Sequence, residues 1–313
     1  MPSTEEVIEN TESIAFEEPA SSHVFNLDGF LSPDGQSSAL LILNQQILIA
    51  GVFEKLWRNY HLHVCADGGA NRLYEYFEGK EESRLSFIPN YIIGDMDSIR
   101  DEVLHFYLEH GAIVVSQSWQ NSTDFMKSLQ LIFLHFHYPE LQRMLKTNDF
   151  AHNYGIDDCH GIETMYNKER ASCTMHDIDL LVLNAIDGRF DQTVHSISQL
   201  YSASKTDPYY RMYFLTATDL IMLIPTGGAL IRYSKEFKAN CIKNCGLLPL
   251  GGPTTINRTK GLKWDVLNWK TSIFDGKVSS NNRFSGETCC FFDVQDPIVL
   301  SIEVVLSKIS SFI

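Results

Sequence analysis

Two acid-bearing segments each follow a short apolar run, and their residue types suit metal and phosphate chemistry. Residues 67–72 (DGGANR) supply an acid, an amide and an Arg, and residues 94–98 (GDMDS) supply two acids. Asp95 and Asp97 are two residues apart, so an extended backbone points both carboxylates to one side. Such a pair suits a hard divalent cation, Mg²⁺ above all, which also binds substrate phosphates. The alternative is a solvated, acid-rich turn, because Gly and Asp are ordinary turn residues.

Two further polar clusters follow apolar runs later in the chain: Thr123, Asp124 and Lys127, and then Arg189, Asp191 and Gln192. Asp124 and Lys127 are three residues apart, which places them on one face of a helix near its N-terminus. A helix N-terminus favours anions, and Lys127 adds a positive charge there. Arg189 can bind a phosphate through two parallel hydrogen bonds. Acids for a metal and bases for phosphates together predict phosphoryl or nucleotidyl transfer.

Two common nucleotide-binding motifs are absent from the sequence. It contains no Gly-x4-Gly-Lys-Ser/Thr loop, and no Gly-x-Gly-x2-Gly segment follows the first predicted strand. These motifs cradle phosphates in P-loop enzymes and in dinucleotide-binding domains. The chain is therefore predicted to be neither an ordinary P-loop kinase nor a dinucleotide enzyme.

The elements that position these clusters alternate between strand and helix over residues 36–227. Apolar runs predict strands at 39–43, 62–66, 91–93, 112–115, 179–183, 212–215 and 220–224, and helical spacing is found between most of them. This alternation indicates an α/β domain with a mostly parallel sheet and helices on both faces. Because the carboxyl ends of parallel strands share one edge of a sheet, the four polar clusters are expected to lie close together.

Residues 228–313 change character, with the boundary placed near Gly227. Short β-like runs are separated by Gly, Pro and Asn/Asp turns, and no long helical pattern is present. This is typical of an antiparallel sandwich or barrel. Trp264 stands out in this half, as do Ser279 and Asn282. A Trp in a β-domain is usually core; alternatively it stacks on a planar cationic ring, with Ser and Asn supplying hydrogen bonds.

Two segments lie outside this two-domain pattern. Residues 1–35 are acidic and aperiodic, which predicts a tail or a loosely docked arm. Residues 143–177 are polar and interrupt the α/β alternation, which predicts a surface insertion. The insertion contains His152, His160, His176, Cys159 and Cys173, which could suggest zinc, but their spacing matches no zinc motif.

Composition narrows the classes of function. The chain has 313 residues and a formal net charge of -14, which argues against a nucleic-acid partner. No apolar run has membrane-spanning length. Six glutamates lie in the first 18 residues and the first basic residue is Lys55, unlike a signal or transit peptide. The seven cysteines are irregularly spaced, so reduced thiols are expected, including Cys241 and Cys245. A cytosolic compartment is therefore predicted.

Taken together, these segments resemble the thiamine pyrophosphokinases of the eukaryotic cytosolic type. The resemblance covers about residues 41–305 in the family's order: 43–45 (LNQ), 65–72 (CADGGANR), 94–100 (GDMDSIR), 122–127 (STDFMK), 188–192 (GRFDQ), 246–252 (GLLPLGG), 261–264 (GLKW) and 278–282 (VSSNN). It implies transfer of the β,γ-pyrophosphoryl group of ATP to thiamine, giving thiamine diphosphate and AMP, with Mg²⁺. It also implies an α/β domain followed by a β-sandwich, and a homodimer with sites between subunits.

The resemblance also assigns roles to residues of this chain. It implies that Asp95, Asp97 and Asp124 hold Mg²⁺ and the phosphates. The catalytic centre would further contain Lys127, Arg189 and Asp191. The nucleotide pocket would be lined by Asn44, Gln45, Asp67, Asn71, Arg72, Gln120, Thr123 and Gln192. Trp264, Ser279 and Asn282 would hold thiamine, from the partner subunit.

Two other functions stay open from the residues alone. A nucleotidyltransferase acting on another small alcohol would share the acids but need no flat cationic acceptor. A non-catalytic module that senses a nucleotide or thiamine would keep Trp264 but could lose the metal-binding acids. Because Asp95, Asp97 and Asp124 are all present, the enzyme is favoured.

Overall fold

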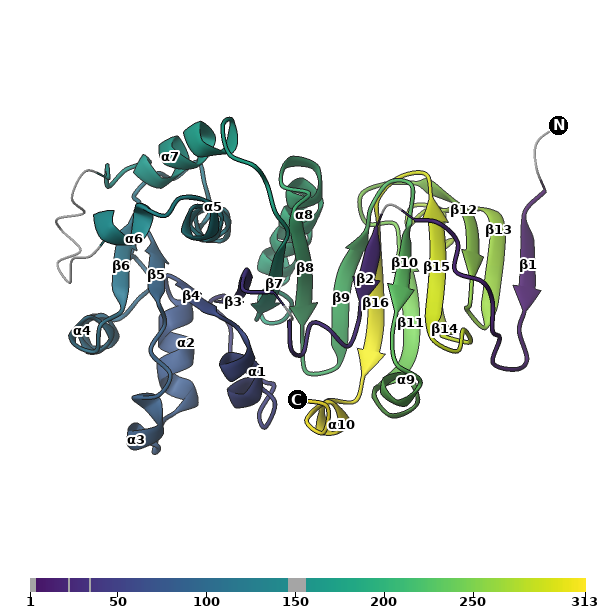
Figure 1. Cartoon of the computed structure of the whole chain (residues 1–313), viewed down its shortest axis with the longest axis horizontal. Helices are drawn as coiled ribbons and strands as arrows, with labels where there is room; N and C mark the ends of the chain where they lie inside the picture. The colour runs from purple at the N-terminus through teal and green to yellow at the C-terminus, as the bar shows by residue number, and fades with distance from the viewer. Residues whose placement is uncertain (1–3, 22, 34, 146–155) are drawn as a thin grey trace.

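The computed structural model describes residues 4–21, 23–33, 35–145 and 156–313. Its strands form a ten-stranded sheet, ordered β14-β11-β16-β9-β8-β7-β3-β4-β5-β6, and a six-stranded sheet, ordered β1-β13-β12-β15-β10-β2. Figure 1 shows the helix-covered end of the larger sheet on one side of the molecule and the paired sheets on the other. The expected fold class, an α/β domain followed by a β-sandwich, is confirmed.

Six neighbouring strands of the larger sheet are parallel, in the order β6-β5-β4-β3-β7-β8. Their bounds are β3 (Ser38–Ile42), β4 (Leu62–Ala66), β5 (Tyr91–Gly94), β6 (Ile113–Ser116), β7 (Ile178–Leu183) and β8 (Tyr210–Leu215). The strand order reverses between β3 and β7. In open α/β sheets a ligand crevice forms outside the carboxyl ends of the strands at such a point.

Helices cover both faces of this parallel region. Residues of α1 (Phe53–Asn59), α2 (Gly69–Tyr76) and α4 (Asp101–Glu109) share one apolar core with Leu40 and Ile92 of the sheet. Residues of α5 (Asp124–His137), α7 (Gly161–Arg170) and α8 (Phe190–Thr206) share the other core with Leu41 and Ile93. Successive strand residues point to opposite faces, so these runs are apolar on both sides. The short helices are α3 (Glu81–Arg84), α6 (Leu141–Met144), α9 (Lys235–Cys241) and α10 (Leu306–Ile309).

The antiparallel half shares the ten-stranded sheet with the parallel half. Strand β9 (Asp219–Ile224) pairs antiparallel with β8 on one side and with β16 (Ile298–Val304) on the other. The change from parallel to antiparallel order therefore comes before Gly227, where the sequence placed the domain boundary. The remaining sandwich strands are β10 (Ala229–Arg232), β11 (Ile242–Leu248), β12 (Thr254–Lys260), β13 (Trp264–Thr271), β14 (Ser279–Arg283) and β15 (Cys289–Val294).

The N-terminal segment is docked along the six-stranded sheet, so the prediction of a tail or loose arm is corrected. Strand β1 (Glu6–Glu9) pairs antiparallel with β13, and β2 (Val24–Asn26) pairs parallel with β10. Leu27, Phe30 and Leu31, which follow β2, are fully buried. Strand β1 is exposed on both faces. Its sequence therefore has no alternation of apolar and polar residues that would predict a strand. Its position depends on backbone hydrogen bonds to an edge strand, which composition does not reveal.

The described part of the insertion at 143–177 contributes a packed helix as well as surface. Ile162 and Tyr166 of α7 are buried beside Phe133 of α5. The polar composition of the segment did not indicate this helix. His152 lies outside the described residues. Among the helices that the structure describes, none is long and apolar enough to cross a membrane.

Candidate active site

Strand ends and two helix starts surround a cavity of about 330 Å³ at the carboxyl edge of the parallel strands. Asn44 follows β3, Asp95 follows β5, and Gln120 lies between β6 and α5. The full lining is Leu43, Asn44, Ala66, Asp95, Asp97, Gln120, Ser122, Thr123, Asp124, Phe125, Lys127, Gln192, His195 and Ser196. Members of three of the four predicted polar clusters therefore line one cavity: Asp95 and Asp97, then Thr123, Asp124 and Lys127, and then Gln192.

Three carboxylates converge at this cavity: Asp95 and Asp124 of its lining, and Asp67 beside them. Oxygens of Asp67, Asp95 and Asp124 all lie within 4.8 Å of one another. A glycine at the end of β5 makes this possible, because a Cβ on Gly94 would lie 2.6 Å from the Asp67 Cβ and 3.0 Å from Asp124 Oδ1. Carboxylate oxygens at this spacing are ligands that a hard divalent cation prefers.

Asp67 and Asn71 hold the loop that carries the two acids of residues 94–98. Asp67 is buried, and its two carboxylate oxygens accept hydrogen bonds from the backbone N–H groups of Ser98 and Ile99, both 3.0 Å long. The Asn71 side chain donates to the Ser98 carbonyl at 2.8 Å and accepts from the Arg100 N–H at 3.0 Å. The sequence predicted that both residues line the nucleotide pocket; in the structure their polar atoms bind this loop.

The three acids differ in how readily they ionise. Burial raises the pKa of Asp67 to about 6, and the neighbouring Asp124 and Asp95 carboxylates also raise it, against the effect of the two backbone N–H groups. Burial likewise raises the pKa of Asp124, although Lys127 acts in the opposite direction. Burial would raise the pKa of Asp95 too, but hydrogen bonds from Gln120 and the Asp97 N–H lower it below its usual value. A bound cation would favour the charged form of all three.

Lys127 places a positive charge inside the cavity. Its side chain is only 4% exposed, and Nζ donates to Asp124 Oδ1 at 3.0 Å from one turn along α5. Thr123 caps this helix, since its Oγ1 accepts a hydrogen bond from the Met126 N–H at 3.3 Å. Gln120 Nε2 donates to Asp95 Oδ2 at 2.8 Å. The helix start thus places a buried cation beside the acids, at a helix N-terminus, which favours phosphate.

The Arg189 and Asp191 side chains lie apart from the cavity lining. They are 72% and 61% exposed, and they bind each other through two hydrogen bonds of 3.1 and 2.6 Å. The Arg72 side chain binds Asn44 Oδ1 at 3.0 Å and Glu75 at 2.9 Å, beside a neighbouring hollow. Gln45 lies against Gly188, whose absent Cβ would be 2.2 Å from Gln45 Oε1. Gln192 and Asn44 belong to the cavity lining. The lining does not include Gln45, Arg72, Arg189 or Asp191.

His195 and Ser196 of α8 also line the cavity, and sequence reasoning missed them. They are three and four residues after Gln192, so they share its helix face. That spacing was the signal that could have identified them. The His195 ring nitrogen Nε2 lies 3.3 Å from Gln199 Nε2.

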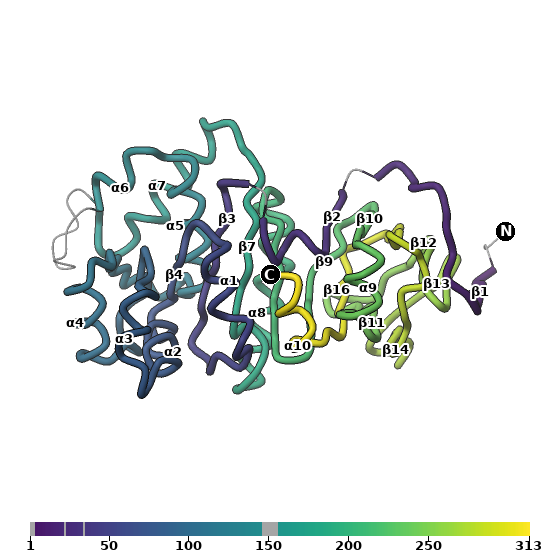
Figure 2. Tube along the Cα trace, turned by 60° about the horizontal axis from the view of Figure 1, so that its bottom comes forward, coloured from purple at the N-terminus to yellow at the C-terminus, as the bar shows by residue number. Residues whose placement is uncertain are grey.

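The three residues predicted for thiamine lie in the sandwich, far from the acids of the same chain. Trp264 begins β13 and is half-buried, and Ser279 and Asn282 belong to β14. Asn282 is buried; its Oδ1 accepts from the Trp264 N–H at 3.1 Å and its Nδ2 donates to the Trp264 carbonyl at 2.9 Å. Figures 1 and 2 show β13 and β14 at the opposite end of the molecule from β5 and α5. The structure brings Trp264 and Asn282 together but does not bring them to the acid cavity of their own chain.

Comparison with known proteins identifies the family. The model of the thiamin pyrophosphokinase catalytic domain matches residues 53–212, and that of the thiamin pyrophosphokinase vitamin B1 binding domain matches 230–299. The chain is 45% identical to thiamine pyrophosphokinase of Saccharomyces cerevisiae over 318 residues, which covers 99% of this chain and 100% of that one. The chain belongs to the thiamine pyrophosphokinase family. The resemblance seen in the sequence is confirmed.

Solved structures of the thiamine pyrophosphokinase family have the same fold. The crystal structure of the yeast enzyme superposes with a TM-score of 0.93 at 45% identity, covering 98% of this chain and 100% of that one. Thiamin pyrophosphokinase from Candida albicans gives a TM-score of 0.83 at 38% identity, covering 97% and 100%. Thiamine pyrophosphokinase 1 of Arabidopsis thaliana is 30% identical over 82% of this chain and 85% of its own length.

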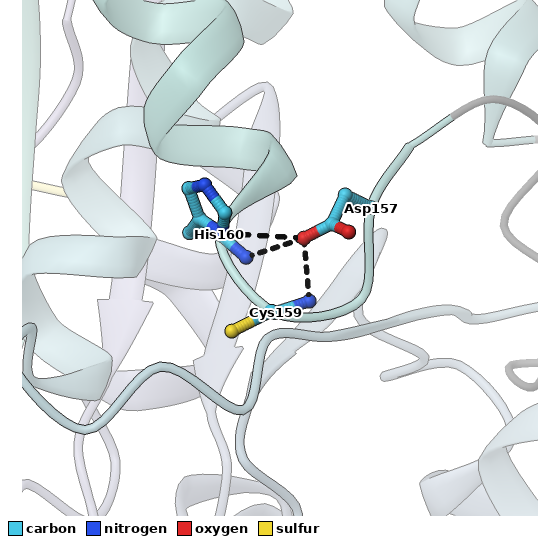
Figure 3. A group of neighbouring side chains, drawn as sticks. All are labelled: Asp157, Cys159 and His160. Carbon is cyan, nitrogen blue, oxygen red and sulfur yellow. Dashed lines mark hydrogen bonds and ion pairs between the residues drawn. The ribbon is translucent and has the colours of Figure 1, made fainter.

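The described His and Cys residues of the insertion include a small cluster, shown in Figure 3. Asp157 Oδ1 accepts hydrogen bonds from the backbone N–H groups of Cys159 and His160, both 3.0 Å long. The His160 ring nitrogen Nδ1 lies 3.3 Å from the same oxygen. These contacts close the turn before α7. This turn also binds the segment that follows β6, because the Ser118 N–H donates to the Asp158 carbonyl at 2.8 Å. The cluster therefore supports the segment that leads to Gln120.

Proposed function

We propose that this chain transfers the pyrophosphoryl group of ATP to the hydroxyethyl oxygen of thiamine, giving thiamine diphosphate and AMP. The observation that carries the proposal is the cavity where Asp95, Asp124 and buried Lys127 converge, in a chain that matches a yeast thiamine pyrophosphokinase over its full length. Convergent acids with a buried cation at a sheet edge suit the charge of a nucleoside triphosphate.

The donor set fits Mg²⁺. Asp95, Asp97 and Asp124 all line the cavity, and the Asp67 oxygens lie within 4.8 Å of those of Asp95 and Asp124. We therefore assign Asp95, Asp97 and Asp124 as the metal-binding residues, with Asp67 beside them. When bound, the cation would neutralise charge on the transferring phosphates.

The residues of the chain supply binding and positioning. Lys127 lies inside the cavity, where it can offset phosphate charge next to Asp124. Arg189 is proposed to leave Asp191 and turn toward ATP, because the pair is exposed at the start of α8 and adjoins Gln192 of the lining. An exposed ion pair contributes little to stability, so its exchange for a phosphate contact costs little. The remaining nucleotide-pocket assignments are Asn44, Gln45, Asp67, Asn71, Arg72, Gln120, Thr123 and Gln192.

Thiamine is proposed to bind at Trp264, Ser279 and Asn282 of a partner subunit, which makes the enzyme a homodimer. The separation of these residues from the acids within one chain supports this arrangement. The exposed part of the indole can stack on the flat cationic thiazolium. We also propose that the enzyme works in the cytosol, which agrees with its seven free cysteines.

The decisive experiment supplies ATP, Mg²⁺ and thiamine to the purified chain and measures AMP and thiamine diphosphate together. Equal amounts of the two products are expected, and Asp97→Asn serves as the matched inactive control. A nucleotidyltransferase would instead release inorganic pyrophosphate and attach AMP to the acceptor. A sensing module would bind the ligands without forming product. Either outcome would overturn the proposed reaction.

A further inference from the structure

The N-terminal arm, residues 4–18, crosses the segment that carries Trp264. Glu9 of β1 lies directly opposite Trp264 in the antiparallel register with β13. Beyond β1 the arm contacts the segment between β14 and β15, where the Ile14 N–H donates to the Ser285 carbonyl at 2.9 Å. The arm thus lies beside the segment assigned to thiamine.

Asn10 makes the densest set of contacts between the arm and this segment. Its backbone N–H donates to the Lys263 carbonyl at 2.7 Å. Its side-chain Nδ2 donates both to the Leu262 carbonyl and to Asp265 Oδ2, each at 2.7 Å. One residue of the arm therefore binds three of the residues that flank Trp264.

Asp265 connects Asn10 to the shape of the turn before Trp264. Asp265 is buried, and besides Asn10 it accepts hydrogen bonds from the Gly261 N–H at 3.1 Å, the Leu262 N–H at 3.0 Å and the Thr259 hydroxyl at 2.9 Å. A buried carboxylate needs such donors, and loss of one weakens the hold of the others.

Apolar and charged contacts of the arm converge on the same segment. Gly261 has a φ of +99°, and a Cβ there would lie 3.0 Å from the Phe16 ring of the arm. Glu9 pairs with Lys263 at 3.9 Å, and Lys263 Nζ lies 4.4 Å from the centre of the Trp264 ring. A cation thus already lies over the indole, which is the kind of group expected to bind there.

We propose that the arm is part of the thiamine half-site and that Asn10 is a positioning residue for it. This inference rests on the proposed role of Trp264 in binding thiamine. Asn282 holds the Trp264 backbone from β14. From the arm, Asn10 binds the neighbours of Trp264 on both sides, Leu262, Lys263 and Asp265. The backbone is held from two directions, so the half-exposed ring is preset for a flat ligand.

The test compares Asn10→Ala with Thr11→Ala, a neighbouring exposed position of the same arm. Asn10→Ala is expected to raise the KM for thiamine about five- to ten-fold, because it removes a hydrogen bond to the charged Asp265. The KM for ATP is expected to stay within about two-fold of the wild-type value. Thr11→Ala is expected to change neither. A merely structural role would instead lower the melting temperature and shift both KM values together, which would overturn the proposal.

Two further variants separate the possible failures. If Asn10→Ala does not fold, Asn10→Gln keeps an amide but displaces it by one methylene, and the same selective rise in the KM for thiamine is expected. Trp264→Ala is the reference for the thiamine site. If Trp264→Ala raises the KM for thiamine and neither Asn10 variant does, the inference about the arm is wrong while the proposed function stands. If Trp264→Ala also has no effect, the thiamine site itself is misassigned.

Discussion

The acid cavity and the Trp264 surface use opposite ways of holding their functional side chains. In the cavity, the backbone of the 94–100 loop binds buried side chains, and the acids are forced close together at the point where Gly94 leaves space for them. At Trp264, buried side chains of Asn282 and Asp265 bind the backbone, and the functional ring is left half-exposed.

The difference follows from the chemistry that each region is proposed to perform. Burial, with the neighbouring carboxylates adding to it, raises the pKa values of Asp67 and Asp124, so ionising both acids in the cavity has an electrostatic cost that a cation relieves. A flat surface for a cationic ring needs no such concentration; it needs a ring whose backbone does not move. Damage to the cavity should therefore reduce turnover, and damage at Trp264 should reduce affinity for thiamine.

The largest expected effect is on turnover when a metal-binding acid is changed. Asp97→Asn should lower kcat about a hundred-fold or more, because an amide is a poor ligand for a hard cation. Asp97 is exposed, so the melting temperature should stay within about 2 °C of the wild type. Steady-state rates at saturating Mg²⁺, with thermal unfolding of the same preparation, test this. Near-normal turnover in a folded Asp97→Asn chain would contradict the metal assignment.

The next effect is restoration of activity by mixing two impaired chains. If the two regions meet across a homodimer, a heterodimer of Asp97→Asn and Trp264→Ala chains has one wild-type site and one doubly impaired site. Random pairing of equal amounts should restore about a quarter of wild-type activity at low thiamine. The measurement needs subunit exchange verified by native mass spectrometry. Verified heterodimers without restored activity would favour a site within one chain.

The third prediction separates binding from folding at Trp264. Trp264→Ala should raise the KM for thiamine about ten-fold, which corresponds to about 1.4 kcal/mol of lost stacking, with little change in the KM for ATP. If the ring were instead core, the same change would cost about 3–5 kcal/mol of unfolding free energy and would impair both substrates. Both KM values and the melting temperature, measured on one preparation, distinguish these outcomes.

The smallest expected effect is a pH dependence of stability that depends on Asp67. Its pKa in the fold is about 6, above the ordinary 3.8, so between these values the folded chain keeps a proton that the unfolded chain has released. The contribution of Asp67 to stability therefore falls as pH rises from 3.8 to about 6. Without Mg²⁺, the melting temperature of wild type relative to Asp67→Asn should fall by a few degrees over this range.

Mg²⁺ provides the control for this last prediction. A cation beside Asp67 favours the carboxylate, so the difference in slope between wild type and Asp67→Asn should shrink when Mg²⁺ is added. If the melting-temperature difference between wild type and Asp67→Asn depends on pH but Mg²⁺ does not change that dependence, the acid cluster is misassigned.

The sequence by itself determined the strand–helix alternation and the positions of the acids. Apolar runs fixed most strands, such as β4, which was predicted with its observed bounds, Leu62–Ala66. Parallel strands end at one edge, so the convergence of Asp95, Asp124 and Lys127 followed from their places after those runs. These features can be predicted because the spacing of apolar residues and the end of a strand depend on residues that are adjacent in the sequence.

Only the tertiary structure decided the roles that depend on contacts between distant segments. In the fold, the Asp67 and Asn71 side chains bind the backbone of the 94–100 loop. His195 lines the cavity, and the N-terminal arm pairs with β13. The fold also placed β13, which begins at Trp264, in the six-stranded sheet and at the opposite end of the molecule from β5. A hydrogen bond between residues more than 250 positions apart, such as Asn10 to Asp265, leaves no periodic trace in either segment. It exists only because the fold brings an exposed edge strand within reach of the arm.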